Sequence, residues 1–397
     1  MRVSTNGAYQ RSLSMMQQLQ SAINHTQLQI ASGRRILTPS DDPIASARTL
    51  DMRESIARLD QFERNSDILG NRLGYEESAL GNVNNALQRV RELAIQANNA
   101  TQSNETRSQI AIEMREQLDS LMQLANQQDG SGRYLFSGNM DDTEPVSRNG
   151  NVFNYNGDQG QRMIQIGDAR QIADGDPGSE VFFRVRSGNG TFAATAAAAN
   201  VGTGVLDGGS VTDPTLYNPE QFTIRFIDPD NYEVVDSGAA VIATGTFDSG
   251  GTIAFNGIQL SIQGDPATGD EFDVSPSVND NIFAMIDDLA TSVESIVLDE
   301  TSRAAMHNGI NNGILAIDQG IGNVIDTRTS VGSRLAAIDG QNNANSSTIL
   351  TLQETIADLQ DLDYTEALSR LTVEAATLEA AQQSFIRMQN LSLFNYL

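Results

Sequence analysis

The sequence predicts an α+β fold: a long antiparallel α-helical coiled-coil or bundle rod made from both termini, with an inserted antiparallel β domain. Apolar residues recur at helical spacing in the first third and again from Asn281 to the end, whereas the middle holds short alternating runs bounded by turn residues. Residues 1–40 contain four Arg and no acid, and residues 350–397 contain seven acids and two Arg. Opposite charges favour pairing of the two ends.

The N-terminal coiled-coil arm, residues 1–43, has a seam of period about 3.5, with Thr26 as its polar interruption. Its apolar members are Met16, Leu19, Ile23 and Ile30. The stretch SGRRILTPSDDP then breaks the helix, with Gly33 in the linker and Asp41 and Asp42 as expected helix caps. The N-terminal part of the helical rod domain, residues 44–140, is expected to hold a helix to about Gly70, its continuation to about Ala97, and a further helix over 105–127.

The segment 141–280 is rich in Gly, Asp, Asn and Pro, and the runs NVFNY, RMIQI, VFFRV, FTIRFI, YEVV and TIAFNGIQLSI are expected strands of the β-rich insertion. Residues 191–204 fit either a short helix or a loop. Helices return in the C-terminal part of the rod domain, 281–349, and in the C-terminal coiled-coil arm, 350–397. Packing residues expected in that arm are Leu371, Leu378, Phe385, Met388 and the apolar end Leu391, Leu393, Phe394, Tyr396 and Leu397.

The amino-acid composition argues against several classes of function. The 397 residues carry a net charge of −26, which repels nucleic acid and anionic lipid surfaces. All bases are Arg, and the absence of Cys excludes disulfides, thiolate metal sites and a Cys nucleophile. No cleaved leader and no membrane insertion are expected, since no apolar run reaches about 18 residues. We expect no catalytic residues, no metal site and no cofactor: DPDNYE (228–233) fits a hairpin turn better than a calcium loop, and the chain lacks the common hydrolase and nucleotide-binding motifs.

Several segments resemble the bacterial flagellin superfamily. IASGRRILTPSDDPIASA and NNALQRVRELAIQANNAT are similar to N-terminal flagellin segments, and the stretch from Leu359 to Leu397 is similar to the C-terminal one. Within the superfamily, SGRYLFSGN, FNYNGDQGQRMIQIG, FNGIQLSIQGDPATGDEFDVSPS and the ending LSLFNYL resemble the hook-associated proteins of the hook–filament junction, the FlgL family. A length of 397 residues also favours that family over the longer junction protein.

The resemblance implies a structural, non-enzymatic subunit of the bacterial flagellum. It implies export of the unfolded chain through the flagellar type III pathway, self-assembly into a ring or helical polymer, and an extracellular location. The implied partners are copies of itself, the other hook-associated junction protein, filament flagellin, and a dedicated export chaperone at the C-terminal segment. The terminal segments would then be buried by neighbouring subunits.

Alternative functions stay open at this point. The chain is also similar to filament flagellin itself. The segments around Arg89, Arg91, Glu92, Leu93 and Glu113 match flagellin rod helices, including those by which an animal innate receptor detects flagellins, although helix packing explains the same residues. A membrane-active terminus is disfavoured because residues 350–397 are net acidic.

Overall fold

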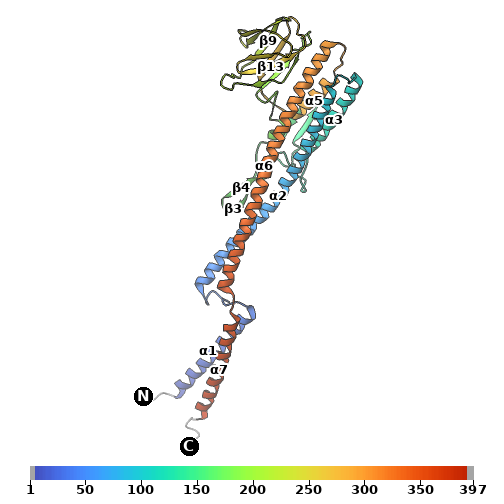
Figure 1. Cartoon of the computed structure of the whole chain (residues 1–397). Coiled ribbons are helices and arrows are strands. Elements are labelled where there is room, and N and C mark those ends of the chain that lie inside the picture. Colours follow the sequence, from blue (N-terminus) through green and yellow to red (C-terminus); the bar gives the residue numbers. More distant parts are fainter. Residues whose placement is uncertain (1–4, 391–397) are drawn as a thin grey trace. The chain divides into compact units, whose positions relative to one another are not determined.

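The computed structural model describes residues 5–390, and the side chains of residue 7 and residues 9–387. The chain divides into two compact units. Unit 1 is drawn from both ends of the chain, up to Arg64 and from Gln341 onward, and unit 2 is Asn65–Gly340. The described residues form seven helices (Figure 1): α1 (Thr5–Ser32), α2 (Pro43–Ala97), α3 (Asn104–Ala125), α4 (Gly178–Phe182), α5 (Ile282–Glu294), α6 (Glu300–Gln360) and α7 (Tyr364–Asn390).

Unit 1 holds α1 and α7 side by side and antiparallel (Figure 1). Their connections to α2 and α6 are joined by backbone hydrogen bonds, from the amide of Arg35 to the carbonyl of Gln360 (2.7 Å) and from Leu362 to Gly33 (3.0 Å). Gly33 has a φ of +69°, and a Cβ there would lie 2.9 Å from the hydroxyl of Tyr364. Only glycine fits this turn without strain.

Unit 2 is built on a helical core from α2, α3, α5 and α6. Apolar residues at spacings of three and four along each helix meet in one cluster, and many are completely buried. Ring contacts between Phe182 and Phe283 and between Phe153 and Phe283 link this cluster to the segment that follows α3. Within the described residues the helical regions expected from periodicity are confirmed, with three differences: α2 runs without a break through Gly70, and the C-terminal helical region is interrupted after Glu294 and again after Gln360.

The segment after α3 packs onto this helical core. It forms two antiparallel hairpins and a single short strand: β1 (Val146–Asn149) with β2 (Val152–Tyr155), β3 (Met163–Gly167) with β4 (Arg170–Ala173), and β5 (Val185–Arg186). The strand expected over VFFRV was wrong for most of its length. Its first two residues end α4, and Phe182 is fully buried against Phe136 and Phe283, so tertiary packing overrides the strand preference of the run.

The β domain proper has a second core of its own, formed between two antiparallel sheets. One sheet has the order β11-β10-β9-β14-β6, and in the other β13 pairs with β12, β7 and β8. Burial alternates along the strands, as in β9 and β13. The strands are β6 (Phe192–Ala196), β7 (Val205–Leu206), β8 (Ser210–Val211), β9 (Phe222–Asp228), β10 (Asn231–Asp236), β11 (Val241–Thr246), β12 (Thr252–Phe255), β13 (Ile258–Gln263) and β14 (Glu271–Pro276).

Two local expectations have clear outcomes. The hairpin turn expected at DPDNYE is confirmed, since it joins β9 to β10 and Asp228 accepts a hydrogen bond from the amide of Asp230. The stretch 191–204 was expected to be a helix or a loop, but Phe192–Ala196 is strand β6 and only the rest is loop. Pairing with β14 gives this alanine-rich run its extended form, against the helical preference of alanine.

A short neck connects the β domain to the helical core. Strand β5 leaves the core and pairs antiparallel with β15 (Asn279–Asp280), which returns to it. Next to this pair, the amide of Ser187 donates to the carbonyl of Val278 (2.9 Å). By packing, the β domain therefore begins near residue 187 and ends near residue 278. The segment between 141 and 187 packs with the helical core. The domain boundaries 141 and 280, which were based on composition, stay a proposal.

A buried charged network holds the loops of unit 2 against α2 and α6. Arg72 is 8% exposed and lies between Asp129 (2.9 Å) and Asp174 (3.5 Å). One turn further, the carboxylate of Glu76 accepts the amide of Asp176 (2.9 Å), and Asp176 pairs with Arg334 of α6. Burial, and then repulsion from Asp176, raise the pKa of Glu76 well above its ordinary value, and Arg334 offsets only part of this.

The geometry of the neck predicts that the β domain can be removed without unfolding the helical core. Replacing Gly188–Ser277 by an Asn-Gly turn should leave the helical core folded, because Ser187 and Val278 are already in hydrogen-bond contact. Far-UV circular dichroism should show a cooperative helical melt, lowered modestly by lost contacts such as that of Asn308 with Leu206. Deleting 141–280 instead removes core residues such as Val146 and Phe182 and should abolish the cooperative melt. Equal behaviour of the two deletions would contradict this division.

The raised pKa of Glu76 predicts a pH-dependent stability. Because the folded state keeps the proton longer than the unfolded state, the free energy of unfolding should fall as pH rises above about 4.5, the ordinary value. Glu76→Gln keeps an acceptor for the Asp176 amide and should flatten that part of the curve, measured by urea unfolding from pH 4.5 to 8. The control is Glu77→Gln, whose carboxylate pairs with Arg328 at 2.6 Å. A Glu76→Gln curve parallel to that of the unsubstituted chain would refute the assignment.

Candidate assembly interface

The facing sides of α1 and α7 form one continuous seam. On α1 the inward positions follow spacings of three and four through Met16, Leu19, Ile23, Thr26 and Ile30. On α7 the same spacing places Ala367, Leu371, Glu374, Leu378 and Phe385 on the inner side. This is the heptad pattern of a two-stranded coiled coil. The described packing residues expected at both ends therefore meet within a single chain.

Burial in this seam is incomplete. Ile23, Thr26 and Ala367 are buried, but Met16, Leu19, Ile30, Leu371, Leu378 and Phe385 are only partly covered. Toward the ends of the pair, the rings of Tyr9 and Phe385 lie 5.0 Å apart, and Tyr9 remains 44% exposed. Two helices alone cannot enclose their contact residues, so the pair retains apolar surface that a third helix would cover.

A polar contact lies in the middle of the seam. The hydroxyl of Thr26, 2% exposed, donates to a carboxylate oxygen of Glu374 at 2.9 Å. Both residues occupy inward positions that are otherwise mostly apolar. A hydrogen bond of this kind is satisfied in one alignment of the helices only, so it fixes their register.

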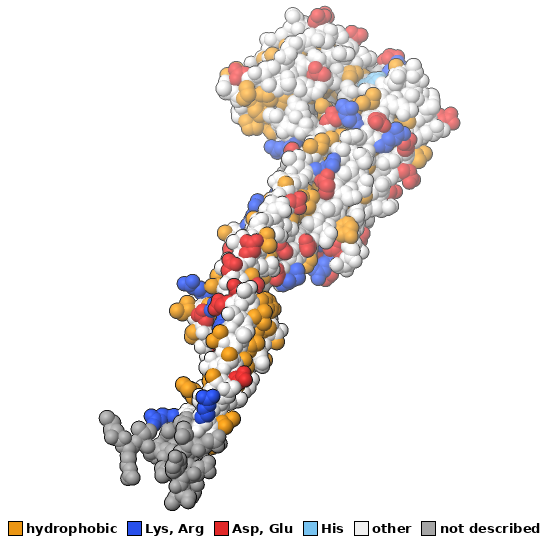
Figure 2. Space-filling model, turned by 60° about the horizontal axis from the view of Figure 1, so that its bottom comes forward, with side chains coloured by type: hydrophobic (Ala, Val, Ile, Leu, Met, Phe, Trp, Pro, Cys, Tyr) orange, Lys and Arg blue, Asp and Glu red, His pale blue; other side chains and the backbone are white. Residues whose placement is uncertain are grey.

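The outer faces of unit 1 carry further apolar side chains. Figure 2 shows hydrophobic groups exposed along the terminal helix pair, next to the grey atoms. The exposed large apolar residues of unit 1 are Tyr9, Leu13, Met15, Leu28, Ile44, Leu50, Leu350, Tyr364, Leu368, Val373 and Ile386. Ile44, Leu50 and Leu350 belong to α2 and α6, and the others lie on α1 and α7. Single exposed apolar residues are ordinary, but a series along a narrow set of helices is typical of a protein–protein contact.

The two aspartates of the linker have different partners. Asp42 accepts the amide of Ala45 (3.0 Å) at the start of α2, the geometry of a helix N-cap, and this hydrogen bond is the main cause of its lowered pKa. Asp41 instead accepts the amides of Leu37 and Thr38, at 2.9 and 2.8 Å, within the linker. Its pKa is lowered chiefly by the Thr38 amide. His25 of α1 also contacts Asp41 at 3.2 Å, which ties the linker to the helix before it.

The residues that match flagellin rod helices make contacts inside unit 2. Arg89 of α2 pairs with Glu113 of α3 (2.6 Å) and with Glu92 (3.2 Å), and Arg91 pairs with Asp318 of α6 (2.5 Å). Leu93 is 1% exposed in the helical core. These side chains join α2 to its neighbours within the chain.

Some expected packing residues lie beyond the described part of the chain. The side chain of Met388 and the residues Leu391, Leu393, Phe394, Tyr396 and Leu397 fall outside it, so their role in assembly stays a prediction. Glu374 was missed at the sequence level, although the signal was present: Leu371 and Leu378 are seven apart, and Glu374 fills the inward position between them.

The described residues contain neither a helix able to span a membrane nor a cluster of metal-ligating side chains. Between residues 5 and 390, no helix combines the length and the hydropathy that crossing a bilayer requires. Among those same residues, no three His, Asp or Glu side chains gather closely enough to hold a metal ion.

Comparisons with known proteins place these features in a family. A model of the bacterial flagellin N-terminal helical region matches residues 3–141. The chain is 23% identical to flagellar hook-associated protein 3 of Salmonella typhimurium over 398 residues, covering 99% of each chain. It is 36% identical to the crystal structure of Xanthomonas campestris FlgL, with a TM-score of 0.73, over 77% of this chain and 99% of that one. The flagellar junction protein FlgL of Legionella pneumophila is 29% identical, with a TM-score of 0.74, over 79% of this chain and 100% of that one.

The extent of these matches separates the two flagellar alternatives. The flagellin model covers about the first third of the chain, whereas hook-associated protein 3 matches from end to end. The combination of long helices with a central antiparallel β domain agrees with the solved FlgL structures, which cover 77–79% of this chain. Filament flagellin is therefore the less well supported reading, and the chain belongs to the FlgL family, the flagellar hook-associated proteins of the hook–filament junction.

Proposed function

We propose that this chain assembles with copies of itself into a ring that joins hook to filament, and that the helix pair α1/α7 supplies the main contact between subunits. The observation that carries the proposal is the incomplete burial of the α1/α7 seam. In unit 2, by contrast, core residues such as Leu80 and Phe283 are completely buried within one chain. The missing cover in unit 1 is best supplied by neighbouring subunits.

The energetics favour contact with several neighbours at once. Full burial of one large apolar side chain contributes about 1.5–3 kcal/mol, and fixing one residue's backbone costs about 1–2 kcal/mol. A helix pair that fully buries only three of the ten seam residues named above gains little from its own packing. Neighbours that cover residues such as Leu28, Leu368 and Val373 change that balance for every subunit in the ring. Assembly would then stabilise the terminal helices.

As a member of the FlgL family, the chain is a structural component of the extracellular flagellum. Its relatives are structural flagellar proteins, and we infer that this chain likewise acts without catalysis or a cofactor. Beside its own copies, we propose the other hook-associated junction protein and filament flagellin as partners. We also propose export of the unfolded chain through the flagellar type III pathway, with a chaperone held at the C-terminal segment.

Substitution of exposed apolar residues tests the assembly surface. Leu368→Gln with Val373→Gln, at residues 52% and 62% exposed, should leave the melting temperature of the isolated chain unchanged, because neither side chain is buried there. The same protein should be exported by a strain lacking the gene but should not restore its motility.

The matched control changes exposed apolar residues outside the helix pair. Val241→Gln with Ile242→Gln, at residues 53% and 44% exposed on β11, should restore motility. Motility restored by the α7 variant would count against the proposed surface. A large drop in its melting temperature would show that these residues pack within the chain.

The contact between Thr26 and Glu374 predicts how substitutions at these two residues change the stability of the terminal helix pair. Thr26→Val leaves the carboxylate without its partner and should weaken the pair by about 1 kcal/mol, whereas Thr26→Val with Glu374→Leu should stabilise it through an apolar seam. Amide hydrogen exchange in α1 and α7 measures both effects. Thr377→Val is the control, because that hydroxyl is exposed and bonds to its own helix at Val373. Identical exchange in both variants would rule out a register-setting contact.

A further inference from the structure

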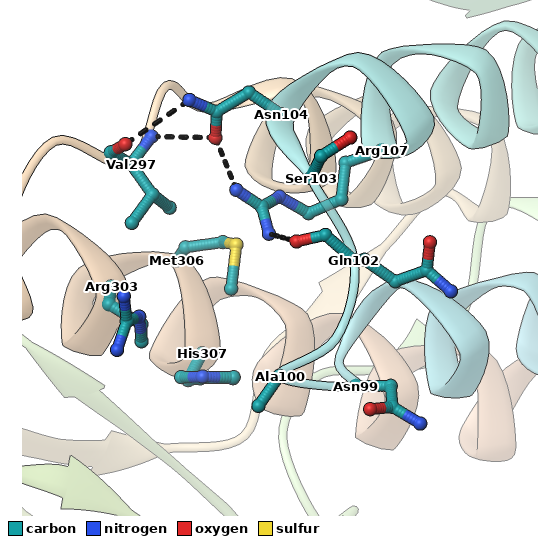
Figure 3. Close-up of a pocket in the computed structure, with 10 residues that line it drawn as sticks. All are labelled: Asn99, Ala100, Gln102, Ser103, Asn104, Arg107, Val297, Arg303, Met306 and His307. Atoms are coloured by element: carbon teal, nitrogen blue, oxygen red, sulfur yellow. Dashed lines mark hydrogen bonds between the residues drawn. The ribbon is translucent and has the colours of Figure 1, made fainter.

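A polar cavity of about 230 Å³ lies at one end of the helical core of unit 2 (Figure 3). It is open to solvent on one side and is lined by the loop between α2 and α3, the first turns of α3, the loop before α6 and the first turns of α6. Its lining residues are Asn99, Ala100, Gln102, Ser103, Asn104, Arg107, Val297, Arg303, Met306 and His307. At about 30 Å³ for each water, the space holds several waters or a small polyatomic ion.

The charge of this cavity is opposite to that of the chain. The whole sequence has 51 acids and 25 bases, yet the lining contains Arg107, Arg303 and His307 and no carboxylate. In Figure 3 these three side chains come from two helices, Arg107 from α3 and the other two from α6. Arg303 is paired with Glu300 at 2.9 Å, so Arg107 is the arginine of this lining that has no carboxylate partner among the described residues. A concave site around such a cation concentrates positive potential.

The side chain of Arg107 is buried, which distinguishes this site from an exposed charged surface. It is 6% exposed, its Nη1 donates to the carbonyl of Gln102 (2.9 Å), and its Nη2 donates to the side chain of Asn104. Its Nε is buried and has no hydrogen-bond partner among the described residues. Both acceptors are neutral, and within the described part of the chain Arg107 has no ion pair.

Another buried arginine of unit 2, Arg72, is paired with carboxylates. It is 8% exposed and has two carboxylates, Asp129 and Asp174, within 3.5 Å. A guanidinium removed from water needs a counter-charge, because desolvation of an unpaired ion costs several kcal/mol. For Arg107 no described carboxylate provides that charge, so an anion from outside the chain is the natural complement.

The neighbouring groups support the same conclusion. Burial, and then Arg303, lower the pKa of Arg107. Burial, followed by Arg303 and Arg107, lowers the pKa of His307. The Nδ1 of His307 faces the side-chain oxygen of Asn98, whose amide group donates to Asn311. Nε2 is therefore the nitrogen that gains a proton in acid, and its proton affinity reports on charge in the cavity.

We propose that this cavity binds a small oxyanion, with Arg107 and Arg303 as its cationic ligands. The planar guanidinium suits a sulfate, a phosphate or a carboxylate, each of which accepts charge-assisted hydrogen bonds. The anion is either a free inorganic ion or the side-chain carboxylate of Asp or Glu from a second copy of this chain.

Proton NMR of the two histidines tests the proposal in the full chain, which has only His25 and His307. Sulfate at constant ionic strength, with chloride as the balancing salt, should raise the pKa of His307 by about one unit and in a saturable manner. The His25 signal, from unit 1, should respond equally to sulfate and chloride. An equal response of both histidines to both salts, with no effect of protein concentration, would overturn the proposal.

Variants identify the ligands. Arg107→Met should abolish the sulfate effect, whereas Arg89→Gln, which removes an exposed and paired arginine elsewhere in unit 2, should preserve it. If Arg107→Met does not fold, Arg303→Gln serves instead and should weaken sulfate binding about tenfold or more, measured by calorimetry. Undiminished binding in the folded variant that is tested would refute the assignment.

Protein concentration separates the two sources of the anion. A pKa of His307 that rises with sulfate in dilute protein supports a free ion. A pKa that rises with protein concentration in chloride alone, and does so only when Arg107 is present, supports a carboxylate from a second copy. Sedimentation at the same concentrations should then show association that Arg107→Met removes.

Discussion

The two ends of the chain must return to each other, and the rest of unit 1 depends on that pairing. Thr26 and Glu374 are 348 residues apart in sequence, and Arg35 reaches the carbonyl of Leu359 across 324. Closing a loop of this length in an unfolded chain is entropically costly. Unit 2 reduces that cost, because once Asn65–Gly340 is folded the remaining segments start from one body.

The two units differ in how completely their side chains are buried and paired within one chain. In unit 2 the helices bury whole side chains such as Leu80, and the charged loops are held by paired groups such as Arg72 and Asp129. In unit 1 the seam is only partly covered and its central contact is a hydrogen bond from Thr26. A single chain therefore satisfies the packing of unit 2 more completely than that of unit 1. Arg107 is an exception in unit 2, since it is a buried charge with no carboxylate partner among the described residues.

Much of the fold could be predicted from local patterns, and the failures have physical causes. Helical periodicity located α3, α5 and the seam residues Ile23 and Leu371, because those residues repeat on one face. VFFRV and the alanine-rich stretch before Asn200 were misjudged, since packing around Phe182 and pairing with β14 decide their form. Glu374 was overlooked because the seam was predicted from the spacing of apolar residues, and Glu374 is polar. Arg107 has no sequence signal, as its isolation depends on which acids lie near it in space.

The neck at β5 and β15 has a consequence for how members of this family can diverge. Because Ser187 and Val278 are hydrogen-bonded neighbours, the chain enters and leaves the β domain at one point, and the domain makes further contacts with α6, such as that of Leu206 with Asn308. Any domain with adjacent termini satisfies the same geometry. The covalent connection alone therefore accommodates inserted domains of other sizes, whereas contacts such as that of Leu206 with Asn308 depend on the β domain that is present here.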